Sequence, residues 1–355
     1  MKYLIPVFTL LMTALASCSG TGAEIQPVHD EHNAAYYWKT VFHLDSADLA
    51  FLKKQDIKRV YLRMFDVTKD AYATDINEKT IPNASVKIGD SDYSLLTDSL
   101  ADMEFVPVVY ITLDALKTMA GHEGVLASNI VNRIANMCSY NCLPNVQELQ
   151  LDCDWTTSTE ASFFALCDSV RNCISRRQLP WRISSTIRLH QLQRKAPPVD
   201  NGVLMVYNTG NFNDPNAENS IISVKDVKPY LKYLSDYPLH LDVAYPTYSW
   251  QLLFRKNQFM GLFNGADLAD TTRFAHRGEN TYAAVCDIPH NNRIIRNGDI
   301  IREETSGYAD ISAVKALIEA ELSGRTHSNI LYHIDYKNLS KYTSDEIDNL
   351  FSTGR

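Results

Sequence analysis

The sequence predicts an α/β fold, a (β/α)8 TIM barrel of eight parallel strands that alternate with helices. Eight apolar, β-rich runs recur along the chain, and most of them are followed by a stretch of helical periodicity. The roughly 335 residues after the amino-terminal segment fit one large barrel. A doubly wound open sheet, the competing architecture, is disfavoured by the number of strands and because no glycine-rich loop follows the first strand.

The elements follow in order along the chain. The first run precedes an amphipathic stretch (DSADLAFLKKQ), the third a helical pattern that continues to Cys138, and the sixth the helix-like VKDVKPYLKYLSD. The helix after the fourth run has Ser158 as its predicted cap and Glu160 in its first turn. A short helix over 344–351 is the last element. The predicted strands span residues 35–44, 58–67, 104–112, 146–154, 181–190, 202–208, 239–245 and 329–336.

A longer segment, about residues 257–307, separates the seventh and eighth strands. We predict that it is an insertion into a single barrel domain over 34–355. It contains two β-rich runs, FMGLFNG and TYAAVCDI, which we interpret as a strand pair, and a polar loop around IRNGD. The helix ADISAVKALIEAEL then leads to the eighth strand. A split into two domains at the insertion is the alternative.

The amino-terminal segment MKYLIPVFTLLMTALASCSG has the layout of a secretory signal. A lysine precedes an apolar run that is shorter than the ~20 residues needed to cross a bilayer. The residues Leu-Ala-Ser-Cys at 15–18 resemble the lipobox of bacterial lipoproteins. This resemblance implies a signal peptide over 1–17, a lipidated Cys18, a tether over 18–33 and a membrane-anchored protein of the cell envelope, periplasmic or surface-exposed. An ordinary cleavable signal is the alternative.

Composition limits the classes of partner. The net charge is −8 and no basic cluster stands out, which disfavours nucleic acid and anionic membrane surfaces as partners. The 19 tyrosines suit sugar binding, although tyrosine is also common in strands. The six cysteines beyond Cys18 lack a zinc-site pattern, so we expect buried thiols or one local disulfide, and neither a metal nor a cofactor.

The fourth run, NVQELQLDCDWT, is polar at every second position. Side chains of a barrel strand alternate between the helices and the interior, and functional side chains gather at the carboxyl ends of the strands, the mouth of the barrel. Glu148, Gln150, Asp152 and Asp154 are therefore predicted to face inward, with the aspartates nearest the mouth. The carboxylates of Asp152 and Asp154 would lie ~6–7 Å apart, a range in which the carboxylate pairs of glycosidases operate. Asp242, on the seventh run, is the predicted catalytic partner of Asp154.

Further polar and aromatic residues are predicted to surround these carboxylates. Aromatic rings can cover the C–H face of a sugar while charged groups bind its hydroxyls or move protons. Each residue has a structural alternative, because Asp152 or Asp242 could pair with an arginine as a buried ion pair and the tryptophans could pack in the core. The predicted substrate-binding residues are Arg63, Tyr110, Trp155, Arg188, Tyr207, Asn208, Tyr245, Tyr248, Trp250 and Asp335.

The run QLDCDW resembles the D-x-D-x-E end of strand 4 in family 18 chitinases. The resemblance places Asp154 at the position of the general acid, Asp152 at the supporting position and Gln150 at the first Asp. Tyr207-Asn208 resembles the Tyr-Asp pair on that family's strand 6. The sequence departs from the family because the acid is shortened to Asp, and because an amide replaces a carboxylate at Gln150 and at Asn208.

Most of the mature chain resembles a bacterial family of unknown function that is predicted to form glycosidase-like barrels. The stretches VYLRMFDV, LQLDCDWT, LDVAYPTYSW and LYHIDY carry this resemblance. It implies the barrel fold and a focus on strand 4, and it implies no reaction.

Three functional hypotheses follow. The first is an exported glycoside hydrolase in which Asp154 is the general acid/base, with its pKa raised by Asp152, and Asp242 is the nucleophile or the water-activating base. The second is a non-catalytic glycan-binding or surface scaffold lipoprotein, which the two amide replacements favour. The third is a metal-dependent polysaccharide deacetylase that uses Asp152, Asp154 and His190 or His333.

Overall fold

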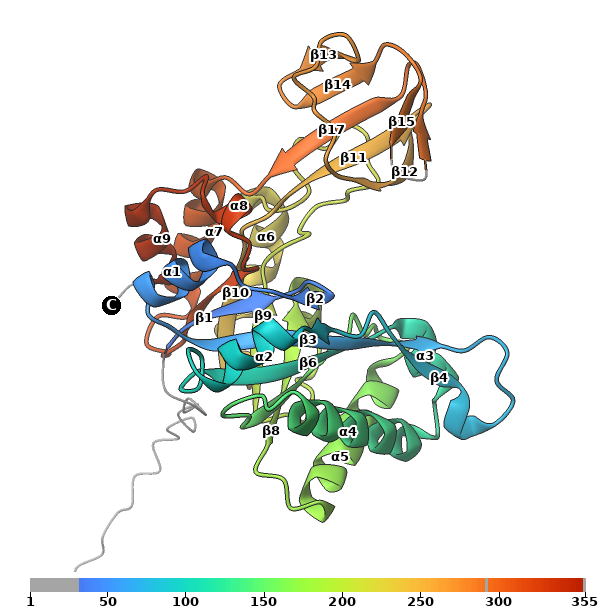
Figure 1. Cartoon of the computed structure of the whole chain (residues 1–355), viewed down its shortest axis with the longest axis vertical. Coiled ribbons are helices and arrows are strands. Elements are labelled where there is room, and N and C mark those ends of the chain that lie inside the picture. Colours follow the sequence, from blue (N-terminus) through green and yellow to red (C-terminus); the bar gives the residue numbers. More distant parts are fainter. Residues whose placement is uncertain (1–31, 291–292, 354–355) are drawn as a thin grey trace, which may run out of the picture.

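A closed barrel of eight parallel strands forms the body of the molecule (Figure 1). The computed structural model describes residues 32–290 and 293–353. The first barrel strand pairs with both the second and the last, which closes the sheet and confirms the predicted (β/α)8 barrel. In chain order the barrel strands are β1 (Asn33–Tyr37), β3 (Ile57–Lys69), β6 (Glu104–Ile111), β7 (Glu148–Asp152), β8 (Arg182–Arg188), β9 (Asn201–Met205), β10 (Leu241–Pro246) and β18 (Asn329–Tyr332).

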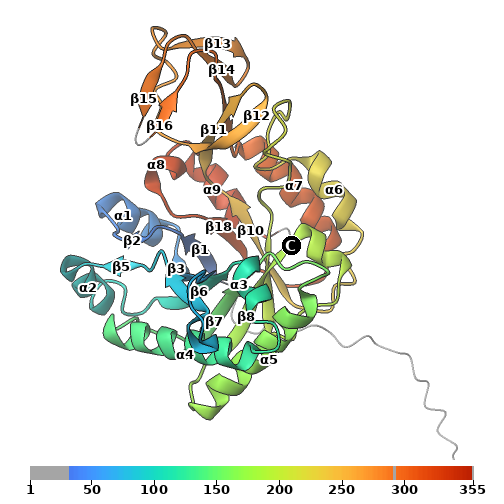
Figure 2. The same ribbon diagram turned by 90° about the vertical axis from the view of Figure 1, so that its right-hand side faces the viewer.

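Helices surround this barrel (Figure 2). Between β8 and β9 the described connection contains the 3-10 helix η2 (Leu189–Gln193) in place of an α-helix, and a second 3-10 helix, η1, spans Ile76–Glu78. The α-helices are α1 (Ser46–Lys54), α2 (Asp90–Thr97), α3 (Leu113–Thr118), α4 (Glu123–Tyr140), α5 (Glu160–Arg176), α6 (Val224–Leu231), α7 (Tyr308–Glu321), α8 (Tyr336–Leu339) and α9 (Ser344–Phe351).

The cap of α5 differs from the prediction. Thr159, and not Ser158, is the residue that precedes the helix. Its hydroxyl does not cap the helix but accepts a hydrogen bond from the backbone N–H of Thr156 at 2.9 Å. This contact closes the short turn between β7 and α5.

Alternation along the strands separates two cores. Leu149 and Leu151 of β7 are fully buried in the layer between strands and helices. A second cluster fills the barrel interior and contains Ala34, Tyr36, Tyr61, Val106, Val108, Val203, Met205, Ala244, Ile330 and Tyr332. The barrel is therefore a packed core whose upper layers are rich in tyrosine, and not an open pore.

Two small strand pairings extend the barrel. Strand β3 continues past its barrel neighbours, and its last four residues pair antiparallel with β4 (Thr80–Asn83). Strands β2 (Val41–Phe42) and β5 (Lys87–Ile88) form a short parallel pair.

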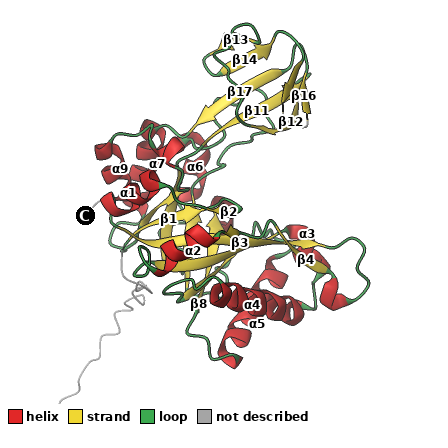
Figure 3. Ribbon diagram, in the orientation of Figure 1, coloured by secondary structure: helices red, strands yellow, loops and turns green. Residues whose placement is uncertain are grey.

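The insertion after β10 is built from strands and stands away from the barrel (Figure 3). Its five-stranded sheet has the order β12-β11-β17-β14-β13, and a separate hairpin joins β15 to β16. The hydrophobic core of the insertion includes Leu253, Phe263, Phe274 and Ile301. The strands are β11 (Ser249–Arg255), β12 (Gln258–Phe263), β13 (Phe274–Gly278), β14 (Thr281–Ala284), β15 (Ile288–His290), β16 (Arg293–Ile295) and β17 (Ile300–Thr305).

The insertion differs from the sequence prediction in two ways. It begins with β11, whose first residue is Ser249, earlier than residue 257. The two predicted strands, now β12 and β14, both exist but are not partners of each other. Strand β12 pairs with β11, and β14 pairs with β13 and β17.

All six cysteines of the described residues are free thiols, four of them buried. Burial raises the pKa of Cys138 to about 12. The expectation of buried thiols therefore holds for four of the six, and no local disulfide forms among them. Within residues 32–290 and 293–353, no helix has the length and apolar character that a membrane span requires. The predicted signal peptide, most of the tether and Cys18 lie outside the described residues.

Candidate functional site

The carboxyl ends of β7 and β8 bring two aspartates and one arginine together at the mouth. Arg188 Nη2 lies 3.0 Å from Asp152 Oδ1, and Arg188 Nε donates a hydrogen bond to Asp154 Oδ1. The Thr186 hydroxyl also donates to Asp152 Oδ1, at 2.6 Å. One guanidinium thus bridges both predicted carboxylates through charge-assisted hydrogen bonds.

The two aspartates differ in their environments. The Asp152 side chain is 2% exposed, whereas 44% of the Asp154 side chain is exposed to solvent. Burial raises the pKa of Asp152, and the positive charge of Arg188 and the Thr186 hydrogen bond only partly oppose this effect. Asp152 is therefore an enclosed group, while Asp154 faces any ligand at the mouth.

Tyrosines form a wall beside this cluster. The Arg188 guanidinium lies 5.4 Å from the centre of the Tyr207 ring, which stacks on Tyr332 at 4.3 Å. Tyr248 meets Tyr207 edge-on, and its hydroxyl donates to Asn208 Oδ1 at 2.7 Å. The predicted residues Arg188, Tyr207, Asn208 and Tyr248 thus come together.

Tyr110 and Arg63 lie on neighbouring strands of the same mouth. Tyr110 of β6 is the neighbour of Asp152 across the pairing with β7. Burial raises the pKa of Tyr110, and the charges of Asp154 and Asp152 raise it further. Arg63 makes a bidentate ion pair with Asp66, with Nε to Oδ1 at 2.9 Å and Nη2 to Oδ2 at 2.5 Å.

Two aromatic residues at the mouth were not among the predicted site residues. Trp38 contacts Tyr332 at 5.5 Å between ring centres and lies 5.5 Å from the Arg63 guanidinium. Tyr332 packs against Tyr36, Trp38, Tyr207 and Tyr248, and its peptide bond to the next residue is cis. The aromatic runs of the first and last strands (AYYW and LYHIDY) were the available signal.

Deeper in the barrel, Gln150 is fully buried in a hydrogen-bond chain. It accepts from the Tyr36 hydroxyl at 2.7 Å and donates to the Ser184 hydroxyl at 3.3 Å. Ser184 in turn donates to Glu148 Oε1. Gln150 and Glu148 therefore hold the interior together and do not reach the mouth.

Asp242 does not lie beside Asp154, which corrects the predicted catalytic pair. It occupies the second position of β10, at the amino-terminal end of the strand and opposite the mouth. Its Oδ1 accepts from the backbone N–H of Ser328 at 2.7 Å and lies 3.5 Å from His240 Nε2. The carboxylate links β10 to the start of β18 and is 1% exposed.

Three other residues that were predicted to bind the ligand pack in the core or stabilise local structure instead. Trp155 is fully buried against Phe163 and Phe164 of α5. Tyr245 is fully buried in the layer between strands and helices, because β10 runs through Pro246 and this position faces outward. Asp335 caps α8 and forms an ion pair with Lys39 at 3.3 Å.

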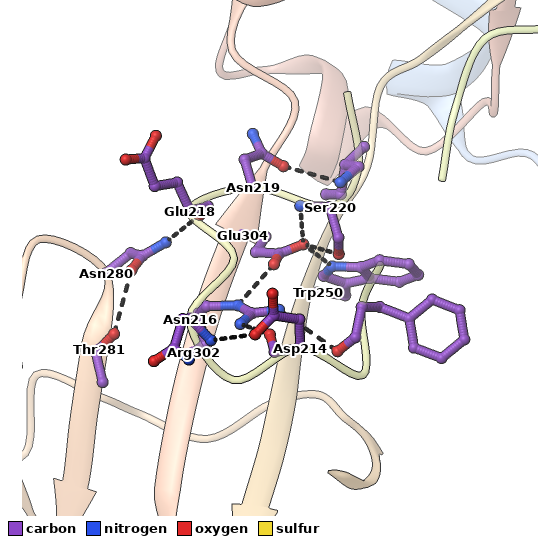
Figure 4. Close-up of polar contacts among 12 residues, drawn as sticks. Asp214, Asn216, Glu218, Asn219, Ser220, Trp250, Asn280, Thr281, Arg302 and Glu304 are labelled. Carbon is purple, nitrogen blue, oxygen red and sulfur yellow. Dashed lines mark hydrogen bonds and ion pairs between the residues drawn. The ribbon is translucent and has the colours of Figure 1, made fainter. Parts of the chain in front are cut away.

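Trp250 is held at the base of the insertion by a buried carboxylate (Figure 4). Glu304 Oε2 accepts from Trp250 Nε1 at 2.7 Å, and also from the backbone N–H and hydroxyl of Ser220. Arg302 Nε donates to Glu304 Oε1 at 2.7 Å, and Arg302 Nη1 donates to the carbonyl of Asp214 at 2.6 Å. This network ties β11 and β17 to the connection between β9 and α6.

The histidines of the deacetylase hypothesis do not join the aspartates. His190 Nε2 lies 3.4 Å from the Trp155 carbonyl, and His333 Nδ1 lies 3.1 Å from the Ile334 carbonyl. Burial lowers the pKa of His333. Among the described residues, no group of three or more His, Cys, Asp or Glu side chains could hold a metal ion.

The fold is similar to solved chitinase-like barrels. The catalytic domain 2 of the group II chitinase of Ostrinia furnacalis, in complex with penta-N-acetylchitooctaose, has a TM-score of 0.54 at 9% identity, covering 90% of this chain and 95% of that chain. The chitinase of Chromobacterium violaceum has a TM-score of 0.50 at 12% identity, covering 90% and 98%.

A family 18 N-acetylglucosaminidase of Paenibacillus barengoltzii likewise has a TM-score of 0.50 at 11% identity, covering 91% of this chain and 100% of that chain. No protein-family model matches the chain, and no curated protein matches it. At these identities the likeness shows the fold alone. The resemblance to glycosidase-like barrels of family 18 is thus confirmed as a resemblance of fold.

Proposed function

We propose that the protein binds a glycan at the barrel mouth and that Asp152, Arg188 and Asp154 hold sugar hydroxyls without cleaving the glycosidic bond. One observation carries this proposal: a single guanidinium donates hydrogen bonds to both aspartates. The cluster therefore presents fixed acceptors and a fixed cation, which together recognise hydroxyl groups.

The arrangement favours binding over hydrolysis by a carboxylate pair. Such hydrolysis requires one carboxyl group that donates a proton and a second carboxylate within about 5–9.5 Å. Both aspartates at the mouth accept from Arg188, and Asp242 lies at the opposite end of its strand. Asp66, near the end of β3, is paired with Arg63, and Asp335, which follows β18, is paired with Lys39.

The aromatic wall supports a sugar as the ligand. Tyr207, which lies under the Arg188 guanidinium, and its neighbour Tyr248 are partly exposed, and Trp250 extends the aromatic surface onto the insertion. Aromatic faces pack against the C–H faces of sugar rings, while nearby polar groups fix orientation. The similar fold of a chitinase that is complexed with a chito-oligosaccharide makes N-acetylglucosamine polymers the first ligands to test.

Hydrolysis by Asp154 is the second candidate function. Two features support it: the resemblance of the strand 4 motif to that of family 18 chitinases gives Asp154 the position of the general acid, and the Asp154 side chain is partly exposed at the mouth. The binding and hydrolysis proposals differ in whether a bound oligosaccharide is cleaved.

The test measures binding and turnover with the same samples. Calorimetry and product analysis with chitotetraose, chitopentaose and a panel of other oligosaccharides would compare the wild type with Asp154→Asn. We expect the wild type to bind without products, and Asp154→Asn to weaken binding about tenfold because a charged hydrogen-bond acceptor is lost. Asp168→Asn, an exposed change on α5, is the matched control. Products that disappear in Asp154→Asn would establish hydrolysis and exclude the binding proposal.

We also propose that Cys18 carries a lipid that anchors the protein in the bacterial cell envelope. The lipobox-like residues that precede it support this proposal. Fractionation of cells that express Cys18→Ser tests it, because the variant should leave the membrane fraction.

A further inference from the structure

The insertion contains a cavity of about 670 Å³ that shares no residue with the barrel mouth. Its volume lies within the range of small-molecule sites, roughly 300–1,000 Å³. Strands β11, β12, β15 and β16 supply the walls of this insertion cavity. It is lined by Leu253, Arg255, Met260, Pro289, Arg293, Ile294 and Arg296.

Three arginines line the insertion cavity, and of these only Arg255 forms an ion pair with another described residue, although the charge of Arg296 also acts on Asp299. Arg255 makes a bidentate ion pair with the buried Asp299, with distances of 2.9 and 2.7 Å. For the guanidinium groups of Arg293 and Arg296, the described residues provide no hydrogen-bond acceptor. The cavity therefore offers two sets of unused cationic donors.

A glycine leaves room for one of these guanidinium groups against the sheet. Gly261 of β12 has a φ of +134°, and a Cβ added there would meet Arg293 Nη1 at 2.8 Å. The Arg293 guanidinium thus lies directly against the β12 backbone, in space that any larger residue would occupy. This close approach brings the hairpin arginine onto the sheet.

Apolar side chains lie beside these donors. Met260 is 43% exposed and Ile294 is 57% exposed, while Leu253 is 4% exposed. A suitable ligand therefore needs an anionic group for the arginines and an apolar face for Met260 and Ile294. A sugar ring with a carboxylate or sulfate has both, and the planar guanidinium fork matches either anion.

We propose that the insertion cavity binds an acidic saccharide, with its carboxylate or sulfate on Arg293 and Arg296 and its C–H face on Met260 and Ile294. The site is separate from the mouth and does not depend on whether the mouth binds or cleaves a glycan. The protein would then have a second binding site, which selects saccharides that carry a negative charge. This site lies in the insertion, which has its own hydrophobic core.

The experiment uses calorimetry at low and moderate salt with three tetrasaccharides. Hyaluronan carries carboxylates, chondroitin sulfate carries carboxylates and sulfates, and chitotetraose is neutral. We expect an acidic tetrasaccharide to bind the wild type, and the double variant Arg293→Gln/Arg296→Gln to weaken that binding about tenfold or more. Binding of hyaluronan would show that a carboxylate is sufficient. Binding of chondroitin sulfate alone would show that a sulfate is required.

Three further variants make the test specific. Arg277→Gln removes the same charge from an exposed position on β13 and should leave acidic binding unchanged. Gly261→Ala keeps the net charge and should still weaken acidic binding, because it displaces Arg293. Asp154→Asn, at the mouth, should have no effect on it.

Several results would overturn the proposal. The first is that the wild type binds neutral and acidic tetrasaccharides equally well, and the second is that it binds no acidic tetrasaccharide. The third is that Arg277→Gln weakens acidic binding as much as Arg293→Gln/Arg296→Gln does. Unchanged thermal unfolding of each variant would show that the comparison is between folded proteins. Failure here leaves chitotetraose binding at the mouth unaffected, so the two proposals are judged separately.

Discussion

Arg188 is a partly buried cation with two carboxylate partners, of which Asp152 is enclosed and Asp154 is exposed. Removing one partner of a buried ion pair is costly because it leaves the other charge without compensation. Burial already raises the pKa of Asp152 in the presence of Arg188. Without Arg188, the neutral form of Asp152 would be favoured further.

We therefore expect Arg188→Met to lower the free energy of unfolding at pH 7 by about 3–5 kcal/mol. The loss should shrink as the pH falls. A carboxyl group whose pKa is raised by folding stabilises the fold at low pH, and this contribution is lost as the pH rises through the raised pKa. Urea unfolding of the variant between pH 4 and pH 8 measures the effect.

The double variant Asp152→Asn/Arg188→Met is the control. It contains no ionisable group at position 152, so the difference in stability from the wild type should vary much less with pH. A loss in Arg188→Met that is the same at every pH would contradict the assignment to Asp152.

For single residues, the sequence predicted whether a side chain faces into the barrel better than it predicted the position of that side chain along the strand. Alternation correctly placed Asp152, Asp154 and Arg188 on the inner face and at the mouth. Asp242 also lies on an inward position, but at the start of its strand, because β10 begins later and ends later than predicted. Tyr245 ends the predicted strand but lies one residue before the end of β10, on its outer face. A strand's ends have weaker sequence signals than its centre.

Strands β11 and β17 connect the insertion to the barrel, and the buried carboxylate of Glu304 on β17 joins them there through its hydrogen bond from Trp250 of β11. Glu304 has a fully buried side chain that accepts from Trp250, Ser220 and Arg302. The Arg302 side chain is 2% exposed, and its guanidinium lies 4.9 Å from the centre of the Phe254 ring. These contacts make the orientation of Trp250 depend on the attachment of the insertion.

Glu304→Gln keeps the shape of this side chain but removes its charge from beside the buried Arg302. We expect faster amide hydrogen exchange in β11, β17 and the connection over 212–220, corresponding to about 3 kcal/mol of lost local stability. Exchange in β6, β7 and β8 should not change. Hydrogen exchange followed by mass spectrometry measures both regions.

Glu303→Gln is the matched control, because Glu303 is the exposed neighbour on the same strand. Equal exchange in the two variants would show that the network in Figure 4 does not hold the insertion in place.

The pairing within the insertion could not be predicted from the sequence. Strand β11 has β17 as its partner across more than forty residues, and no local turn signal links them. The amphipathic helices were easier to identify, and α9 spans the predicted residues Ser344–Phe351. Local periodicity therefore located most elements, whereas long-range pairing required the folded structure.

For the whole molecule, recurring apolar runs were sufficient to predict the barrel. All eight predicted strands overlap the observed ones, because strands buried on both faces are conspicuous in sequence. The similar chitinase folds extend over about nine-tenths of the chain. What the fold leaves open is chemistry, which depends on a few side chains at the mouth.

The free thiols have a practical consequence for the complete fold. Four lie in the layer between strands and helices, and two are exposed. The six described thiols should therefore divide into two groups by their rate of alkylation. Iodoacetamide pulses followed by mass spectrometry should label the exposed pair at once and the other four only as the barrel unfolds. Because no disulfide joins any of the described residues, a reductant should leave their melting temperature unchanged. The folded body would then be equally stable in an oxidising or a reducing compartment. The buried thiols are Cys138, Cys153, Cys167 and Cys173, and the exposed ones are Cys142 and Cys286.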